Sequence, residues 1–145
     1  MVKPVIKKIS PADFFKDEKD KIKINWFCYE YALELQSLLD KKLKNKFKKK
    51  RISQETIINF CIQHSKFMKE QVLLQLAGKI PNVGINYIEI EKLLPCADDK
   101  LVDDILLVSA EAWDSQTEGC CSCPTRCISE KDAYAPMFDE KYYYE

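Results

Sequence analysis

The stretch IKINWFCYEYALELQSLLDKKLKNKFK, residues 22–48, decides the fold of this chain. It contains neither glycine nor proline, and its apolar residues recur at intervals of three and four, as one face of a helix requires. That apolar face consists of Ile22, Trp26, Phe27, Tyr31, Leu35, Leu38, Leu39, Leu43 and Phe47. The spacing predicts one long amphipathic helix whose apolar side packs against the rest of the protein.

A second long helix is predicted for residues 54–77. Ser53 can cap its amino terminus. Gly78 and Pro81 end it, because glycine accepts the left-handed conformation after a helix and proline cannot continue one. Its apolar face comprises Ile57, Ile58, Cys61, Met68, Val72, Leu73 and Leu76. We expect the two long helices to pack antiparallel.

Two shorter segments complete the predicted set of helices. Residues 85–91 combine β-branched side chains with the apolar pattern of a helical turn, and a short helix is favoured because no partner strand is evident. A last helix, capped by Asp98 or Asp99, is predicted to run through Trp113. The predicted core consists of Trp26, Tyr31, Leu35, Leu38, Ile58, Met68, Leu73, Leu106 and Trp113.

These elements predict an all-α fold. The 145 residues suit a single domain with one core, so residues 1–145 are expected to form one helical bundle. It has two long antiparallel helices and one or two shorter ones. Residues 1–20 are predicted to form an N-terminal arm, and residues 119–145 a cysteine-rich loop and tail.

The two halves of the sequence carry opposite charges. Residues 1–80 hold 18 Lys or Arg and 9 Asp or Glu, whereas residues 81–145 hold 5 and 14, so net charges of +9 and −9 cancel. Such asymmetry gives a long-range attraction between the halves if they fold together. A basic face that survives folding would meet an anionic partner.

No segment predicts export or a membrane span. The amino terminus has no apolar core of signal-peptide length, and no apolar run approaches the length of about 20 residues that crosses a bilayer. Seven cysteines in such a chain are better explained as thiols or metal ligands than as a disulfide framework, since an odd number cannot all pair within one molecule. We expect a soluble cytoplasmic protein.

The strongest chemical signal is the segment GCCSCPTRC, residues 119–127. Its spacing, Cys120-X2-Cys123-X3-Cys127, can bring three thiolates round one soft metal ion. Zinc is the preferred ion. An iron–sulfur cluster is the alternative, although the full ferredoxin run of cysteines is absent, and thiol–disulfide chemistry is a further one.

A tetrahedral zinc site needs a fourth ligand, and Cys96, in the turn before the last helix, is the preferred candidate. A last helix of about 15 residues would be about 22 Å long, so the cysteine loop would have to fold back to reach Cys96. Cys61 and His64, on one face of the second helix, are competing ligands, and Cys121 is another. Outside the cluster, however, Cys28 and Cys61 suit small core residues, and His64 suits a surface or hydrogen-bonded histidine.

A second candidate site is the basic run KKLKNKFKKKR, residues 41–51, with eight positive charges. Such a run can attract phosphates. Its single aromatic residue, Phe47, belongs to the buried face, so a solvated helix end is the favoured interpretation. Likewise, the acidic residues that follow suit compensation of the helix dipole better than a hard-cation site. They are Asp98, Asp99, Asp103 and Asp104.

Together these features favour a small zinc-stabilised binding or regulatory protein with an undetermined protein partner. An iron–sulfur or thiol-based redox or electron-transfer protein is the alternative, and a nucleic-acid-binding module using residues 41–51 comes third. The chain has only three glycines, and no phosphate-cradling loop or nucleophile–base motif is evident, so no catalytic residue is assigned. Neither the oligomeric state nor the biological process is indicated.

Overall fold

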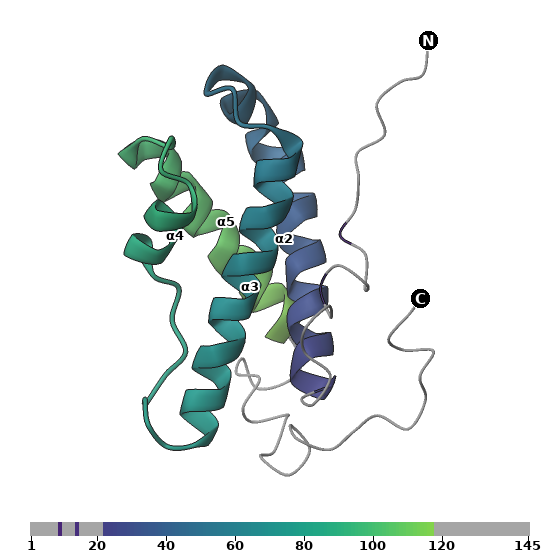
Figure 1. Cartoon of the computed structure of the whole chain (residues 1–145), viewed down its shortest axis with the longest axis vertical. Coiled ribbons are helices and arrows are strands. Elements are labelled where there is room, and N and C mark those ends of the chain that lie inside the picture. Colours follow the sequence, from purple (N-terminus) through teal and green to yellow (C-terminus); the bar gives the residue numbers. More distant parts are fainter. Residues whose placement is uncertain (1–8, 10–13, 15–21, 118–145) are drawn as a thin grey trace.

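The fold is known from a computed structural model, which describes Ile9, Phe14 and residues 22–117 (Figure 1). These residues form four helices and no strand: α2 (Ile22–Lys49), α3 (Gln54–Leu76), α4 (Tyr87–Leu93) and α5 (Asp99–Thr117). The predicted all-α fold is therefore confirmed. The predicted cysteine loop and tail lie outside the described residues, as does the N-terminal arm apart from Ile9 and Phe14.

The two long helices run side by side in opposite directions (Figure 1). The helix α2 also packs against α5, and the short α4 contacts both α3 and α5. Ile9 and Phe14 are buried against this bundle. The backbone of Ile9 is held by α2, where it donates to Gln36 Oε1 at 3.2 Å and accepts from the Tyr29 hydroxyl at 3.1 Å.

The connection between α2 and α3 is a tight left-handed turn. Arg51 has φ +59°. Its N–H donates to the Lys48 carbonyl at 3.1 Å, and the N–H of Ile52 donates to the Phe47 carbonyl at 3.0 Å. This is the Schellman pattern, in which the left-handed position is usually a glycine because other residues suffer a clash at Cβ. Here an arginine occupies it.

The predicted helix caps are present. The Ser53 hydroxyl accepts from the Thr56 N–H at 3.2 Å, and Gly78 has φ +74° just beyond the end of α3. Asp98 caps α5 by accepting from the Leu101 N–H at 2.9 Å. The boundary that differs most is the end of α5, which continues to Thr117 rather than stopping at Trp113.

The predicted core is partly corrected. Tyr31, Leu35, Met68 and Trp113 are buried as expected. The other five predicted core residues are half-buried and pack at its edge: Trp26, Leu38, Ile58, Leu73 and Leu106. The centre instead includes small side chains that let the helices approach closely. Cys28, Ala32, Cys61, Ser65 and Ser109 all have 0% exposure.

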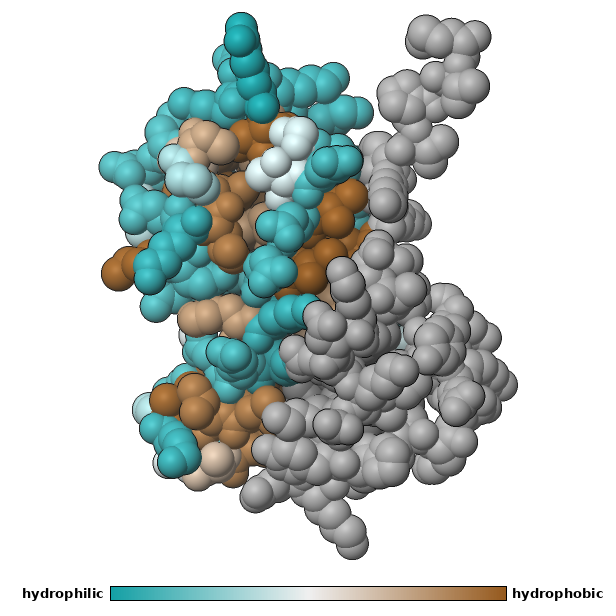
Figure 2. Space-filling view, in the orientation of Figure 1, coloured by the Kyte–Doolittle hydropathy of each residue, from teal (hydrophilic) through white to brown (hydrophobic). Residues whose placement is uncertain are grey.

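None of the described helices combines the length and apolar character of a membrane-spanning segment. In the coloured part of Figure 2, hydrophilic side chains surround several apolar areas.

Candidate functional site

Only one of the four predicted zinc ligands lies in the described part of the chain. Cys96 is exposed, in the turn between α4 and α5. Cys120, Cys123 and Cys127 lie outside the described residues, as does the alternative ligand Cys121. Within residues 22–117, together with Ile9 and Phe14, no three His, Cys, Asp or Glu side chains are grouped to hold a metal ion.

The helix α5 separates Cys96 from the cysteine segment. It has 19 residues and is therefore about 28 Å long at about 1.5 Å per residue. Cys96 precedes its amino-terminal end, whereas residues 119–127 follow its carboxy-terminal end. The separation is larger than the sequence had suggested, because α5 runs four residues beyond Trp113.

The other two described cysteines are core residues. Cys28 and Cys61 are fully buried, and burial raises the pKa of both thiols far above the usual range. A thiol that stays protonated is neither a nucleophile nor a metal ligand. The interpretation of Cys28 and Cys61 as small core residues is therefore confirmed.

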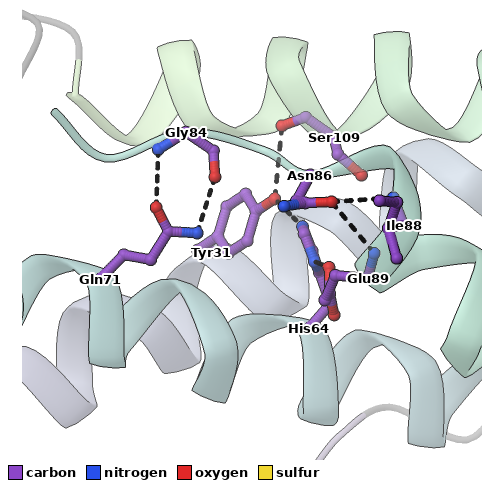
Figure 3. Close-up of polar contacts among 8 residues, drawn as sticks. All are labelled: Tyr31, His64, Gln71, Gly84, Asn86, Ile88, Glu89 and Ser109. Atoms are coloured by element: carbon purple, nitrogen blue, oxygen red, sulfur yellow. Dashed lines mark hydrogen bonds and ion pairs between the residues drawn. The ribbon is translucent and has the colours of Figure 1, made fainter.

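A chain of hydrogen bonds through the core links all four helices (Figure 3). His64 of α3 is fully buried, and its Nδ1 lies 2.6 Å from Oε1 of Glu89 in α4. Its Nε2 lies 2.9 Å from the hydroxyl of Tyr31 in α2. That hydroxyl also donates to the backbone carbonyl of Ser109 in α5, at 3.4 Å. Each helix thus contributes one group to this polar network.

The Ser109 carbonyl can only accept, so the Tyr31 hydroxyl donates in that contact. In the contacts of His64 with Tyr31 and with Glu89, the donor depends on which ring nitrogen carries hydrogen. Each polar atom of the imidazole has a partner, which suits the core because an unpaired polar group is costly to bury.

Aromatic rings fix the position of His64. Phe60 stacks on the imidazole with ring centroids 5.4 Å apart and an interplanar angle of 5°, and Phe67 lies on it at 6.5 Å. Trp113 meets the Tyr31 ring edge-on at 5.0 Å. Burial raises the pKa of Tyr31 well above its usual value, so this phenol stays a neutral donor. Both ring nitrogens of His64 are engaged, and binding a metal would require breaking one of these hydrogen bonds.

Two side-chain amides set the position of α4 (Figure 3). Gln71 of α3 forms a pair of hydrogen bonds with Gly84, donating to its carbonyl at 2.8 Å and accepting from its N–H at 2.9 Å. Asn86 caps α4 by accepting from the N–H groups of Ile88 and Glu89. These bonds hold the loop before α4 against α3, so Glu89 reaches His64.

Glu89 is also where the network approaches the surface. A cavity of about 410 Å³ lies between α3 and α4. Its lining residues are Gln63, Phe67, Asn86, Ile88, Glu89, Lys92 and Leu93. The side chain of Glu89 is 12% exposed, and its second oxygen, Oε2, is buried with no hydrogen-bond partner among the described residues. The Glu89 carboxylate that lines this cavity is therefore the same group that contacts His64 in the core.

Seven of the eight basic residues in the run 41–51 form two rows along α2, and the eighth, Lys49, lies near Lys46 and Lys50. One row faces α5, where it forms three ion pairs: Lys42 with Glu111 at 2.6 Å, Lys46 with Asp104, and Lys50 with Asp98 at 2.7 Å. The expected attraction between the oppositely charged halves is therefore realised. All six side chains are at least partly exposed, so water and salt weaken these ion pairs. The Lys50 ammonium and the Leu101 N–H hold the pKa of Asp98 below its usual value.

Sequence reasoning missed the Tyr31–His64–Glu89 network. It identified His64 as a candidate ligand or a hydrogen-bonded histidine but did not assign its partners. The three residues are separated by 33 and 25 positions, so no local spacing connects them. The sequence did contain one indication of such a network. Tyr31 and His64 both lie on predicted apolar faces, and a polar atom buried there needs a hydrogen-bond partner.

Comparison with known proteins identifies no relative, since no family model, curated protein or solved structure matches this chain. The functional interpretation therefore rests on the chemistry of its own residues.

Proposed function

We propose that this protein is a zinc-stabilised binding or regulatory module, in which the helical bundle carries a metal-bound cysteine segment. The observation that carries this proposal is the spacing Cys120-X2-Cys123-X3-Cys127. Three thiolates at these intervals suit a soft ion, and full coordination by protein ligands makes such a site structural rather than catalytic. The zinc ion would hold the segment in one conformation that a protein partner can recognise.

The bundle supports this proposal in two ways. Cys28 and Cys61 belong to the core with protonated thiols, which leaves Cys96 and the clustered cysteines as the thiols suited to a metal. The described helices also have a continuous apolar core of their own. Zinc would therefore order one region instead of maintaining the whole fold.

The length of α5 limits how Cys96 can serve as the fourth ligand. Cys120 is three residues beyond Thr117, and three extended residues span about 10 Å, compared with about 28 Å for α5. Three residues also separate Cys96 from Asp99, so Cys96 and Cys120 of one molecule would meet at an ion only if both connections lay extended along α5 or if α5 shortened. Cys96 from a second molecule faces no such limit, and zinc would then join two chains. The role of Cys96 stays a prediction.

Elemental analysis with a visible spectrum tests the proposal, on the full chain purified without oxygen and without a metal-affinity column. We expect a colourless protein with zinc in stoichiometric amount. Iron with inorganic sulfide and a brown colour would favour the redox or electron-transfer alternative for the same cysteines. A metal-free protein with seven titratable thiols would overturn both assignments.

Single substitutions assign the ligands. Cys120→Ser, Cys123→Ser and Cys127→Ser should each lose zinc while the helical circular dichroism signal remains, because the core lies elsewhere. Cys28→Ala is the matched control and should retain zinc. Loss of zinc from Cys96→Ser, together with a change from dimer to monomer in sedimentation, would assign Cys96 as a ligand supplied by a second molecule. Retention of zinc by Cys96→Ser would assign the fourth position to another group, with Cys121 tested next.

A further inference from the structure

The outer side of α2 carries a row of basic residues that the ion pairs with α5 leave unused. Lys41, Lys44, Lys48 and Arg51 are all exposed, and none forms an ion pair with a residue that the structure describes. Their spacing places them on the side of α2 opposite its buried face, with Arg51 continuing the row just beyond the helix. We call these four residues the outer basic stripe. The inner row is Lys42, Lys46 and Lys50.

Arg51 provides a second, independent observation. It occupies the left-handed position of the turn after α2, with φ +59°, where glycine would avoid a steric clash. Residues held in unfavourable backbone conformations often mark functional positions, because stability is given up there for another property. At this position the side chain adds a fourth charge at the end of the stripe.

The absence of large apolar side chains from the stripe indicates what kind of partner suits it. In the described part of the chain, the large apolar residues with high exposure are Leu74, Ile88 and Leu107, which lie on α3, α4 and α5. An interface with a protein has an apolar centre, and a helix lying on a membrane inserts apolar side chains. A nucleic-acid backbone, by contrast, is bound mainly through its phosphate charges.

We propose that the outer basic stripe binds the phosphate backbone of nucleic acid without sequence specificity. The stripe is about 15 Å long, since it covers ten residue steps at about 1.5 Å each. Phosphates on one strand of a duplex repeat every 3.4 Å along the axis, so four side chains can each reach one. Lysine and arginine contacts to phosphate position a protein but do not read bases. This inference is independent of the zinc proposal, because α2 lies outside the cysteine segment.

The dependence of DNA affinity on salt concentration measures the number of phosphate contacts. The full-length protein is titrated into a fluorescein-labelled 20-base-pair DNA duplex, with anisotropy recorded between 25 and 200 mM NaCl. Four phosphate contacts predict that the logarithm of the binding constant falls with the logarithm of salt concentration with a slope of about −3.6. Absence of binding at 25 mM NaCl would overturn the proposal.

Two variants with equal changes in charge distinguish the stripe from general electrostatics. Lys41→Gln/Lys44→Gln/Lys48→Gln should reduce the magnitude of the slope by about one for each side chain and weaken binding at 50 mM NaCl at least tenfold. Lys42→Gln/Lys46→Gln/Lys50→Gln removes the same charge from the inner row and should retain the slope. An equal loss of DNA affinity and of salt slope in both variants would contradict a specific role for the outer basic stripe.

Arg51→Gly separates binding from stability. Glycine relieves the left-handed strain, so the melting temperature should rise by about 2 to 5 °C while the salt slope falls by about one. An unchanged slope would limit Arg51 to the turn and remove it from the stripe.

Polyglutamate and anionic phospholipid vesicles are tested as alternative anionic ligands in place of DNA. Binding to either at the same strength as DNA would overturn the assignment to nucleic acid.

Discussion

At the scale of single residues, the bundle depends on polar side chains in its centre as well as on apolar ones. His64 is fully buried between aromatic rings, and its two nitrogens reach Glu89 and Tyr31. Each of these groups satisfies the next, so removing one leaves another buried without a partner. Such a network makes the packing of the helices specific at the risk of large losses on mutation.

His64→Ala is expected to lower the free energy of unfolding by about 3 to 5 kcal/mol, because it leaves the Glu89 carboxyl and the Tyr31 hydroxyl without their buried partner. Tyr31→Phe should cost about 1 to 3 kcal/mol. Urea denaturation measures both. Gln63→Ala is the control, since this neighbour is exposed and should change stability by no more than about 0.5 kcal/mol. A loss below 1 kcal/mol for His64→Ala would contradict the network.

Alkaline pH should destabilise the protein through Cys28, Cys61 and Tyr31. Burial raises the pKa of all three above the unfolded values of about 8.5 and 10, so their contribution is complete at neutral pH and is lost as pH rises towards the folded-state values. Lys69 opposes this trend between about pH 8 and 10, because burial lowers its pKa to about 8. The net effect is a loss of stability that continues above pH 10.

Urea denaturation of the wild type and of Cys28→Ala/Cys61→Ala between pH 9 and 11 isolates the contribution of the thiols. Each buried thiol should add about 1.4 kcal/mol per pH unit to the slope, and the double variant should lack both contributions. Its lower stability at pH 7 does not affect this comparison of slopes. Parallel curves for the two proteins would show that the thiols ionise equally in the folded and unfolded states.

At the scale of secondary structure, local sequence signals end and begin the helices. Ser53 follows the turn after α2 almost at once and caps α3, so the two long helices are joined by only four residues. A connection this short suits antiparallel neighbouring helices. The helix ends are therefore points where one residue affects a whole element.

Ser53→Ala should lower the free energy of unfolding by about 1 kcal/mol, because the first turn of α3 loses the hydroxyl that accepts from the Thr56 N–H. Thermal denaturation followed by circular dichroism measures the change. Ser37→Ala, at an exposed position inside α2, is the matched control, and it should leave stability unchanged or slightly higher because alanine favours helix. Equal effects at the two positions would argue against the cap.

At the scale of the whole molecule, α4 is the element that depends most on contacts made by others. It is seven residues long, and its position follows from the Gln71–Gly84 hydrogen bonds, the Asn86 cap and the contact between Glu89 and His64. A helix of this length is marginal in isolation. Contacts with the other helices therefore fix the position of α4, and with it the cavity beside Glu89.

Chelation of zinc should leave the described bundle folded. EDTA treatment of the full chain is expected to preserve the helical circular dichroism signal and to increase proteolysis within residues 118–145, because the proposed site lies outside the bundle core. Limited proteolysis with mass spectrometry checks this. The apo form of Cys120→Ser is the control and should show the same cleavage with and without EDTA. Unfolding of the helices on chelation would mean that zinc supports the entire fold.

Much of the fold was predictable because its signals are local. The spacing of apolar residues located α2 and α3, and Ser53, Gly78 and Asp98 marked their limits or the start of α5. The depth of burial was harder to predict. Trp26 and Leu38 lie on the predicted apolar face, yet both are half-buried and pack at the edge of the core. The candidate zinc site is likewise a local pattern, but its fourth ligand depends on distances between elements.

The sequence by itself determined an all-α chain with two long helices, their caps and the clustered thiols, because helix periodicity, capping and chelate spacing operate over a few neighbouring residues. Only the tertiary structure decided that Tyr31, His64 and Glu89 meet in the core, and that α5 pairs with one row of lysines but, among the described residues, not with the outer basic stripe. These pairings join residues far apart in the sequence. They arise when helix packing brings distant polar groups together and excludes the water that would otherwise solvate them.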